Sequence, residues 1–483
     1  ENKDMMFAWF DIESDSGACG KASVLSISGV LSNDNFQILD EFTLLSRPRK
    51  SRPLEVDAML VNGLDIDHLM KQDTYGVMLK KLEEKFNDWK KMGAIFVGFN
   101  NHNYDTVLLN HSLFVNLRWP YLTNSDSFDL LPVVRSVNLF APNSISFELN
   151  DKNLPIYKLE SVCRVNNIKT ESHTSYGDTV STMKLGELLA KKAPEVFKAS
   201  LALRRKSDVL PKLQSTPIFC WMEAWRVAKI YAGTLLGEGI YPSWYLTYDL
   251  RKPPEEILSV LNDTDAFKKE LDASPKWCRT QKANRSPLLM DKKYALNDDV
   301  YKNLGMKELE RRQKVISQNR EEILNKIKTI QQERLDEKMQ NDQRKLEPEQ
   351  MIYKLNPSIE ERKLMDAFNL AETNDEKKKI FNKFKRDELK TLAEMVIYEE
   401  HTEEDFIKIL SKRDYTRIKK RIASFILNND GDDSVFTNIP AQFARLDTLK
   451  LQAENDEDNE KMKKLIKLDK YLFNMQSNYE KYI

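Results

Sequence analysis

The chain is 483 residues long and carries 75 basic and 75 acidic side chains, so its formal net charge at pH 7 is zero. A chain of this length favours two or three domains and is long enough to bury a large core. Its mean hydropathy of -0.57, without any long apolar run, excludes a membrane-spanning segment. The balanced charge gives no overall indication of a polyanionic partner, so such an indication has to come from a local cluster.

The N-terminal sequence and the cysteines indicate the expected cellular location and the redox state of the thiols. Residues 1–10 contain no basic stretch followed by an apolar core and a small-residue cleavage site, so the cytoplasm is the expected location. The cysteines are far apart and lack the paired spacing of metal ligands: Cys19, Cys163, Cys220 and Cys278. We therefore expect reduced, unlinked thiols.

Residues 6–193 alternate apolar strand-like runs with helical patterns, which predicts an α/β layer architecture. The expected strands span 7–12, 22–31, 36–45 and 94–99. Before the last of these strands, apolar residues recur at helical spacing over residues 75–91. The predicted order is therefore three strands, a helix, a fourth strand and a second helix.

The rest of the chain changes composition twice. Residues 215–298 are richer in Trp, Tyr, Pro and Gly, which predicts a small β-rich domain. After residue 303 the composition turns to Lys, Glu, Gln and Leu and predicts helices to the C-terminus. The first of these helices has apolar residues at near-heptad spacing: Leu309, Ile316, Ile323, Ile327 and Ile330. Packing of this stripe on its own domain is favoured over an oligomerising coiled coil.

Two acidic residues lie at the end of the first predicted strand. Asp11 and Glu13 occupy alternate positions, so both carboxylates emerge on one face of the sheet. Two such charges repel each other unless a divalent cation neutralises them, and hard oxygen ligands suit Mg²⁺ or Mn²⁺. Taken alone, this triplet is a weak signal, and a solvated strand end is the favoured alternative.

Further acidic residues follow in a similar setting. The buried strand at 94–99 ends in a polar loop that delivers Asp105 at the start of a helix, where capping of that helix is the alternative role. His173 and Asp178 precede an apolar-periodic helix over 180–189. Asp178 is expected on that helix and His173 in the loop before it.

The chemistry of phosphodiester cleavage explains this grouping. It requires a nucleophilic hydroxide, neutralisation of the phosphate oxygens and stabilisation of the leaving alkoxide, and two carboxylate-held divalent ions provide all three. His173, with a side-chain pKa near neutrality in general, is the candidate general base. The other histidines are expected at the surface or in packing positions: His68, His102, His111 and His401.

At this point the residues resemble the DEDD exonucleases with a histidine in the third motif, and within them the exodeoxyribonuclease I family. Three ordered motifs carry the resemblance: Asp11-Ile-Glu13, Gly98-Phe-Asn-Asn-His-Asn-Tyr-Asp105, and His173 with Asp178. The segments 58–64, 120–121, 128–131, 158–160 and 276–288 also have counterparts in that family. The family commonly has Thr at the position of Ser14. Its third motif usually reads His-Asp-Ala followed by two residues and Asp, whereas this chain has His173-Thr-Ser-Tyr-Gly-Asp178. The resemblance is strong in the nuclease motifs and loose after residue 304.

The resemblance implies a ribonuclease H-like exonuclease domain with a mixed sheet (1–200), an SH3-like β domain (201–304) and an all-helical C-terminal domain (305–483). It implies metal binding by Asp11, Glu13, Asp105 and Asp178, with general-base action by His173. The implied activity is 3′→5′ hydrolysis of single-stranded DNA to 5′-mononucleotides with two Mg²⁺ ions per site, or Mn²⁺ in their place. It also implies docking of the C-terminal tail of single-stranded DNA-binding protein. We expect a monomer.

A single-strand nuclease needs cations for phosphates and aromatic faces for bases. Two basic segments are candidates, with solvated surface as the alternative. The first comprises Lys198, Arg204, Arg205, Lys206 and Lys212. The second comprises Lys276, Trp277, Arg279, Lys282 and Arg285. The rival functions are a 3′→5′ exonuclease acting on short RNA and a catalytically silent single-strand-binding protein.

Overall fold

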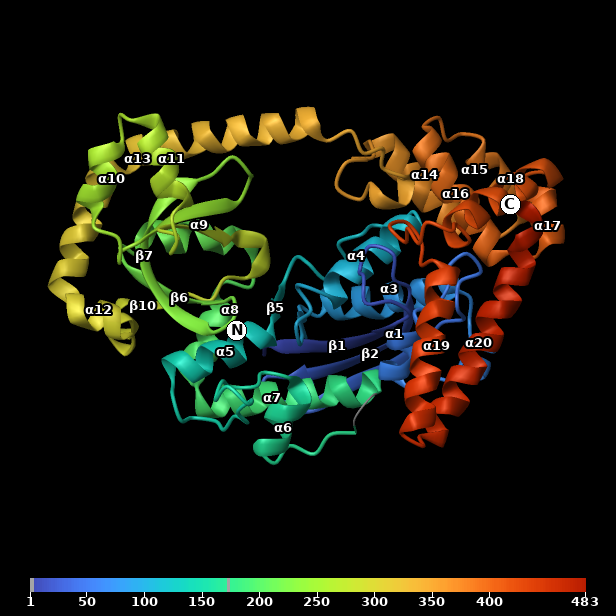
Figure 1. Ribbon diagram of the computed structural model, residues 1–483, viewed down its shortest axis with the longest axis horizontal. Coiled ribbons are helices and arrows are strands. Elements are labelled where there is room, and N and C mark those ends of the chain that lie inside the picture. The colour runs from blue at the N-terminus through green and yellow to red at the C-terminus, as the bar shows by residue number, and fades with distance from the viewer. Residues whose placement is uncertain (1–3, 172–173) are drawn as a thin grey trace.

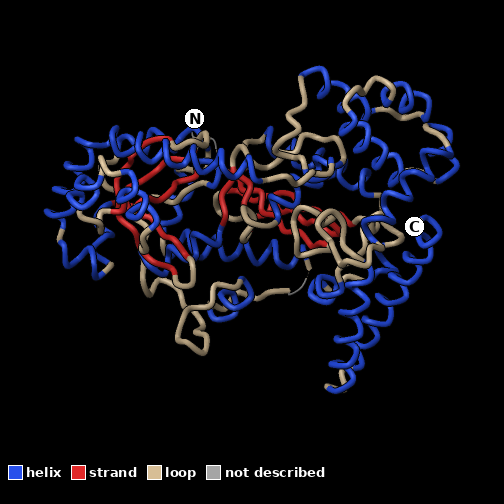
Figure 2. The backbone as a smooth tube through the Cα atoms, turned by 45° about the horizontal axis from the view of Figure 1, so that its top comes forward, coloured by secondary structure: helices blue, strands red, loops and turns tan. Residues whose placement is uncertain are grey.

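The computed structural model describes residues 4–171 and 174–483 and contains two five-stranded β-sheets surrounded by helices. Figure 1 shows the first sheet in the centre of the molecule, the second sheet on the left and the C-terminal helices on the right. In Figure 2 the strands of the two sheets form separate red groups, and the helices lie outside them.

The first sheet has the order β3-β2-β1-β4-β5. Its strands are β1 (Met6–Ser14), β2 (Val24–Asn33), β3 (Ile38–Leu45), β4 (Ile95–Gly98) and β5 (Ser127–Asp129). The first three strands pair antiparallel, whereas β4 pairs parallel with β1 and β5 pairs parallel with β4. The sheet is therefore mixed, and the four predicted strands are present with shifted ends. The short β5 was not predicted, because its three residues are too few for a recognisable period.

Helices cover both faces of this sheet. They are α1 (Val56–Asn62), α2 (Ile66–Leu69), α3 (Tyr75–Lys91), α4 (Asp105–Val115), α5 (Leu130–Phe140), α6 (Leu159–Val165), α7 (Ser175–Lys192) and α8 (Pro194–Ala202). Phe10 on β1 is buried with residues of α3 and α4, whereas Trp9 is buried with residues of α5 and α7. Gly186 lets α7 approach the Trp9 ring closely, because any side chain at that position would clash with the indole. The predicted helix at 75–91 coincides with α3.

The second sheet has the order β10-β6-β7-β8-β9, and all its pairs are antiparallel. The strands are β6 (Phe219–Ala224), β7 (Ala228–Glu238), β8 (Trp244–Asp249), β9 (Cys278–Lys282) and β10 (Met290–Asp291). The associated helices are α9 (Lys206–Ser215), α10 (Pro254–Val260), α11 (Thr264–Asp272), η1 (Ala283–Arg285), η2 (Lys292–Asn297) and α12 (Asp299–Leu304). The predicted β-rich segment thus forms one sheet with helical insertions.

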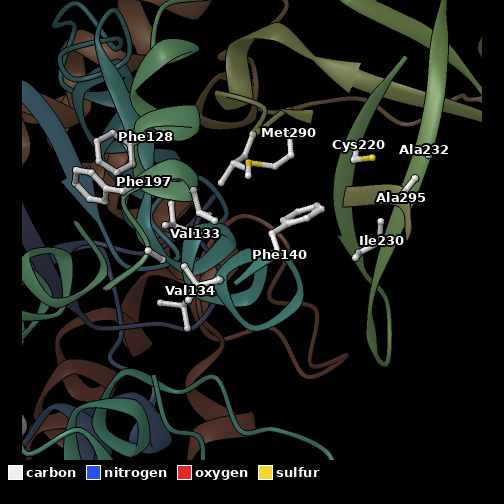
Figure 3. Packing of buried hydrophobic residues seen from close by; sticks show 14 of the residues in the cluster. Phe128, Val133, Val134, Phe140, Phe197, Cys220, Ile230, Ala232, Met290 and Ala295 are labelled. Atoms are coloured by element: carbon white, nitrogen blue, oxygen red, sulfur yellow. The ribbon is translucent and has the colours of Figure 1, made fainter. Parts of the chain in front are cut away.

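The two sheets share part of their core. Figure 3 shows Val133, Val134 and Phe140 of α5 on one side and Cys220 and Ile230 of β6 and β7 on the other. All of these side chains belong to a single buried cluster. The second sheet is therefore fixed against the helices that cover the first sheet.

The long helix α13 (Met306–Asn341) crosses the second sheet along β7. Its five stripe residues are all buried in the same cluster as the side chains of that sheet: Leu309, Ile316, Ile323, Ile327 and Ile330. Gly237 of β7 lies against Leu324 of the helix. The apolar stripe therefore packs within the chain, as the favoured alternative predicted.

The remaining residues are helical. The elements are η3 (Pro348–Gln350), α14 (Ile359–Leu370), α15 (Asn374–Phe381), α16 (Asp387–Glu400), α17 (Glu403–Ile409), α18 (Lys412–Ile426), α19 (Ile439–Asn455), α20 (Asn459–Tyr479) and η4 (Glu480–Tyr482). Leu54, Met59 and Phe114 of the first part are buried in the same cluster as these helices. The C-terminal helices therefore pack directly on the part of the chain that carries the first sheet.

Candidate active site

Asp11 and Glu13 lie at the end of β1, on the face of the sheet that α7 covers. Because side chains alternate along a strand, both carboxylates point to the same side as the buried Trp9. The apolar residues fill the sheet up to this point, and the acidic residues follow where the core ends. The sequence prediction of one shared face is confirmed by the strand.

The start of α7 brings a third carboxylate to the same place. The N-cap residue Thr174 accepts a hydrogen bond from the third backbone N–H of the helix at 2.9 Å. The hydroxyl of Ser175 lies 2.7 Å from the hydroxyls of both Ser26 and Ser28 on β2. These contacts fix the first turn of α7 over the sheet and thereby place Asp178 beside β1.

The carboxylates converge on one pocket. Ligand oxygens of Asp11, Glu13 and Asp178 all lie within 4.8 Å of one another. Asp105, the first residue of α4, is buried and lines the same cavity of about 260 Å³. Val61 of α1 also lines it and is largely exposed at its rim. The structure therefore brings together all four acidic residues that the sequence selected.

Burial and mutual repulsion disfavour the ionised forms of these carboxyl groups. Burial raises the pKa of Asp11 well above its usual value, and the charges of Asp105, Glu13 and Asp178 add to the effect. Burial, followed by the charge of Asp178, raises the pKa of Glu13 to about 8. The pKa of Asp105 is raised well above normal by burial and by neighbouring carboxylates. A positive partner is required if these groups are to be ionised at neutral pH.

The residues fit a divalent cation. Oδ2 of Asp11 is buried and accepts no hydrogen bond from the described residues, and an oxygen in that state needs a positive partner. The donors are exclusively carboxylate oxygens, which are the hard ligands that Mg²⁺ and Mn²⁺ prefer. The carboxylate cluster is therefore the candidate metal site among the described residues.

A hydroxyl bridge that the sequence analysis missed ties the two acidic segments together. The hydroxyl of Tyr104, the residue before Asp105, lies 2.5 Å from Oγ of Ser14, the residue after Glu13. The same Tyr104 hydroxyl donates to the carbonyl oxygen of Ser16 at 2.7 Å. This bridge fixes the spacing between the end of β1 and the start of α4. Only the tertiary structure reveals it, because the partners are 90 residues apart.

Asp129 holds the loop between β4 and α4. Its carboxylate accepts hydrogen bonds from the backbone N–H groups of Asn100 at 2.7 Å and His102 at 3.2 Å. Burial raises the pKa of Asp129 to about 6, although these hydrogen bonds act in the opposite direction. Asp129 is one of the carboxylates that raise the pKa of Asp105. It therefore positions the loop and also adds to the negative potential of the pocket.

The loop between α18 and α19 holds the turn between β1 and β2. Nζ of Lys21 in this turn pairs with the carboxylate of Asp433 at 2.5 Å. The buried Arg52 donates to the carbonyl oxygens of Lys21 at 3.2 Å and Val435 at 3.3 Å. Because this turn directly follows Glu13, the helical region contributes to the geometry of the carboxylate pocket.

The histidines divide as follows. His173, the predicted general base, lies outside the described residues. His102 is buried in the loop before α4, where burial and the nearby Arg285 lower its pKa to about 4. It is therefore neutral at physiological pH. His68 is exposed and His111 and His401 are partly buried, which agrees with surface or packing roles for all four.

One of the predicted strand contacts is corrected, and a second is paired within the sheet. Trp277 is only 2% exposed, its ring packs against Tyr248 and Phe267, and its indole N–H donates to a backbone carbonyl. A base therefore has no access to this ring. Arg279 is paired with Glu223 and lies over the Tyr231 ring at 3.8 Å, so its charge is already compensated within the sheet. The sequence indicated basic and aromatic character here but not which side chains face solvent.

The other predicted cations are placed at the surface with different partners. Arg204 and Arg205 both pair with Asp126, at 2.8 and 3.0 Å. Arg285 donates to the carbonyl oxygen of His102 at 2.7 Å, and so connects the second sheet to the loop before α4. Nζ of Lys282 lies 4.0 Å from the Trp244 ring centroid, and Lys276 is about half exposed. Three further lysines of the first basic segment, Lys198, Lys206 and Lys212, are exposed.

A groove of about 1160 Å³ lies beside these cations. Its lining residues include Asn103, Trp225, Arg226, Lys229, Lys276 and Lys282. Asn103 is followed directly by Tyr104 and Asp105, which line the carboxylate pocket. Trp225 and Arg226 were not among the predicted strand contacts. The only signal for them was an aromatic residue next to a basic one between two short strands.

The fold and this pocket together define a class of protein. A mixed sheet with three antiparallel and two parallel-paired strands, whose first strand ends in two acidic residues of a carboxylate cluster, is the arrangement of a ribonuclease H-like nuclease domain. It is followed here by an SH3-like sheet and an all-helical region.

Comparison with known proteins narrows this class. No protein-family model matches the chain. Exodeoxyribonuclease I of Buchnera aphidicola subsp. Schizaphis graminum is 24% identical over 216 residues, which cover 43% of this chain and 44% of that protein. Exodeoxyribonuclease I of Haemophilus influenzae is 23% identical over 216 residues, 43% of this chain and 45% of the relative. The matched segments thus span less than half the length of these curated relatives.

Solved structures match over the full length. An exonuclease I from Methylocaldum szegediense superposes with a TM-score of 0.79 at 16% identity, covering 98% of this chain and 99% of that one. Escherichia coli exonuclease I in complex with a dA16 oligonucleotide gives the same TM-score at 16% identity, covering 98% and 100%. At this identity the likeness establishes the fold. The sequence matches are to proteins named exodeoxyribonuclease I, and the solved structures named exonuclease I share the fold of this chain.

Proposed function

We propose that the chain is a metal-dependent 3′→5′ exonuclease that hydrolyses single-stranded DNA to 5′-mononucleotides. The observation that carries this proposal is the convergence of Asp11, Glu13, Asp105 and Asp178 on one pocket of the first sheet. Curated relatives bear the name exodeoxyribonuclease I, and similar solved structures are described with bound dA16 and dT13 oligonucleotides. The direction and the single-strand preference follow from the family resemblance.

In this proposal the four carboxylates hold two Mg²⁺ ions, or Mn²⁺ in their place. Bound divalent ions supply an activated water and neutralise the charge that develops on the phosphate. The chain itself supplies the geometry, since Tyr104 and Ser14 fix the spacing of the acidic segments and Asp129 holds the loop before Asp105. We assign to His173 the role of general base, taking the proton of the attacking water.

We propose that residues 1–200 contain the nuclease site and that the SH3-like part at 201–304 binds the strand. The helices at 305–483 then enclose the strand further. Lys276, Arg279, Lys282, Arg285, Arg204 and Arg205 remain candidate phosphate contacts, whereas the buried Trp277 is withdrawn. A solved structure is described as an SSB/exonuclease I complex with an inhibitor. We propose the C-terminal tail of single-stranded DNA-binding protein as a partner of this chain. We also propose that the chain acts as a monomer in the cytoplasm. Among the described residues, the helices lack the length and apolarity needed to cross a membrane.

A digestion assay tests the function. The intact chain is incubated with single-stranded DNA labelled at the 3′ or the 5′ end, with duplex DNA and with short RNA, each with Mg²⁺ and with chelator. We expect rapid release of the 3′ label as a mononucleotide, progressive shortening of the 5′-labelled strand, and no cleavage with chelator. Preferential cleavage of RNA would replace the proposal with the ribonuclease alternative. Binding without any cleavage would leave a silent single-strand-binding protein.

A further inference from the structure

A buried lysine joins the turn after β1 to the C-terminal helical region. The Lys21 side chain is only 8% exposed, and its ammonium group lies 3.8 Å from a carboxylate oxygen of Glu55 and 2.5 Å from one of Asp433. Nζ also donates to the carbonyl oxygen of Asp433 at 2.9 Å. Asp433 belongs to the loop 427–438 between α18 and α19. An ammonium group removed from water is strongly unfavourable without such partners, so this loop supplies the compensation that the buried lysine requires.

Glu55 connects the same lysine to the residues that follow Glu13. One carboxylate oxygen of Glu55 accepts a hydrogen bond from the Ser16 hydroxyl at 2.6 Å. The other oxygen accepts one from the backbone N–H of Gly17 at 3.0 Å. Because the Lys21 ammonium group attracts the same carboxylate, it helps to hold the first residues after Glu13.

A buried arginine provides a second connection from this loop to the turn. One guanidinium nitrogen of Arg52 donates to the carbonyl oxygens of Lys21 and Val435. The guanidinium carbon of Arg52 lies 4.2 Å from the centroid of the Phe436 ring. Val435 and Phe436 follow Asp433 in the same loop. The loop therefore reaches the side chain of Lys21 directly and its backbone through Arg52.

The pairing of the sheet leaves Glu13 dependent on this turn. β1 and β2 pair regularly as far as Glu13 and Ser26, but the register shifts before Ser14, which pairs with Val24. Such an irregularity redirects the chain and its side chains, so the direction of the Glu13 carboxylate depends on the contacts that hold the turn. The proposed metal ligand Glu13 thus lies where the regular pairing ends and the turn held by Lys21 begins.

We infer that Asp433 is a positioning residue of the nuclease site: by holding Lys21 it keeps Glu13 in the geometry that binds a metal ion. The inference rests on the proposed function, because it takes the carboxylate pocket to be the metal site. Without the Asp433 carboxylate, the described residues leave Lys21 with Glu55 alone as a carboxylate partner, at 3.8 Å. The turn after Glu13 is then held less firmly, and the metal ion loses a well-placed ligand.

The test is a titration of the full chain with Mn²⁺ without DNA, in which the electron paramagnetic resonance signal of the free ion gives the dissociation constant. Asp433→Asn is expected to raise this constant about 10-fold, the lower end of the effect of a residue that orients a metal ligand. Asp433→Glu keeps the charge and is expected to stay closer to the parent chain. Asp430→Asn, at an exposed position of the same loop, is the matched control and is expected to bind Mn²⁺ as the parent chain does.

A double-mutant cycle tests the route through Lys21. Lys21→Met removes the ammonium group while keeping much of the side-chain length, and Asp433→Asn is then expected to have little further effect on Mn²⁺ binding. With limiting Mg²⁺, Asp433→Asn should also lower turnover on single-stranded DNA, and excess Mg²⁺ should restore most of it. A contact that only fastens the two regions together would lower the melting temperature in EDTA and leave the Mn²⁺ dissociation constant unchanged.

Two results overturn the inference. One is a Mn²⁺ dissociation constant for Asp433→Asn equal to that of Asp430→Asn, and the other is an undiminished effect of Asp433→Asn in the Lys21→Met background. The single variants at the half-exposed Asp433 suffice for the first comparison if Lys21→Met does not fold. Absence of cleavage by a parent chain that binds Mn²⁺ would instead overturn the proposed function alone.

Discussion

The carboxylate pocket and the groove lined by Trp225 show how differently sequence and structure contribute to two neighbouring sites. Every acidic residue that lines the pocket was selected from the sequence, because Asp11 and Glu13 lie at the end of a strand, and Asp105 and Asp178 lie in the first turns of two helices. The groove was expected in the right region, but around Trp277, which is buried, and not around Trp225, which is exposed. Strand ends can be identified from periodicity, whereas the exposure of one aromatic residue depends on what packs against it.

The largest effect is expected from the removal of a pocket carboxylate. Asp11→Asn and Asp178→Asn should each reduce kcat/KM for single-stranded DNA by roughly 10³-fold or more, because loss of a metal ligand removes several kcal/mol of charge stabilisation in the transition state. Quenched-flow or gel assays of mononucleotide release measure the effect. Asp88→Asn, on the exposed surface of α3, is the control. Near-normal turnover in a pocket variant would show that the cluster has a structural role.

The second prediction concerns the residue that the sequence selected and that lies outside the described part of the chain. His173→Ala should lower kcat by roughly 10²- to 10⁴-fold, as expected for loss of a general base. The affinity for single-stranded DNA in EDTA should change little, since the role is proton transfer. His111→Ala serves as a control among the other histidines. Unaltered turnover in the His173 variant would assign the proton to another group.

The third prediction is a dependence of stability on pH that a metal should remove. The pKa values of Glu13, Asp11 and Asp105 are raised in the folded chain, so the folded state binds more protons than the unfolded state above their ordinary pKa range. Unfolding therefore becomes easier as pH rises. In EDTA the melting temperature should fall between pH 6.5 and about 8.5. His102, whose pKa is lowered to about 4, is neutral in this window and therefore has no influence on the melting temperature there.

Added Mg²⁺ should raise the melting temperature and flatten this pH dependence, because the cation favours the ionised carboxylates and binds the folded state. Differential scanning fluorimetry with and without EDTA measures both effects. Glu13→Gln should show a shallower fall in EDTA than the parent chain. A melting temperature that rises with pH in EDTA would contradict the electrostatic description of the pocket.

The smallest expected effect separates two neighbouring cations of the second sheet. Lys282→Ala should flatten the salt dependence of single-strand binding by a log–log slope of about 0.7, the value for one lost phosphate contact. Arg285→Ala should lower turnover on long and short strands alike, because Arg285 is bonded to the loop that precedes Asp105. Binding titrations at several salt concentrations, paired with turnover measurements, distinguish the two. An unchanged slope for Lys282→Ala would assign it to solvated surface.

The residue pattern alone predicted an α/β architecture for the first part of the chain and selected the acidic residues of the pocket, whereas the class of the first domain and its mixed sheet came from the family resemblance. It could do so because strand and helix periods are local, and because the spacing of Asp11 and Glu13 dictates their common face. It also predicted that the stripe on α13 packs within the chain.

The contacts between residues that are far apart in the sequence could be identified only from the tertiary structure. The Tyr104–Ser14 bridge, the Lys21–Asp433 pair and the exposure of Trp225 at a hairpin tip all depend on contacts between distant segments. Trp221, Trp225 and Trp277 are the same residue type in the same β-rich part of the chain, yet of these three only Trp225 is exposed. Burial is a property of the assembled sheet and its neighbouring helices, and no local pattern of residues encodes it.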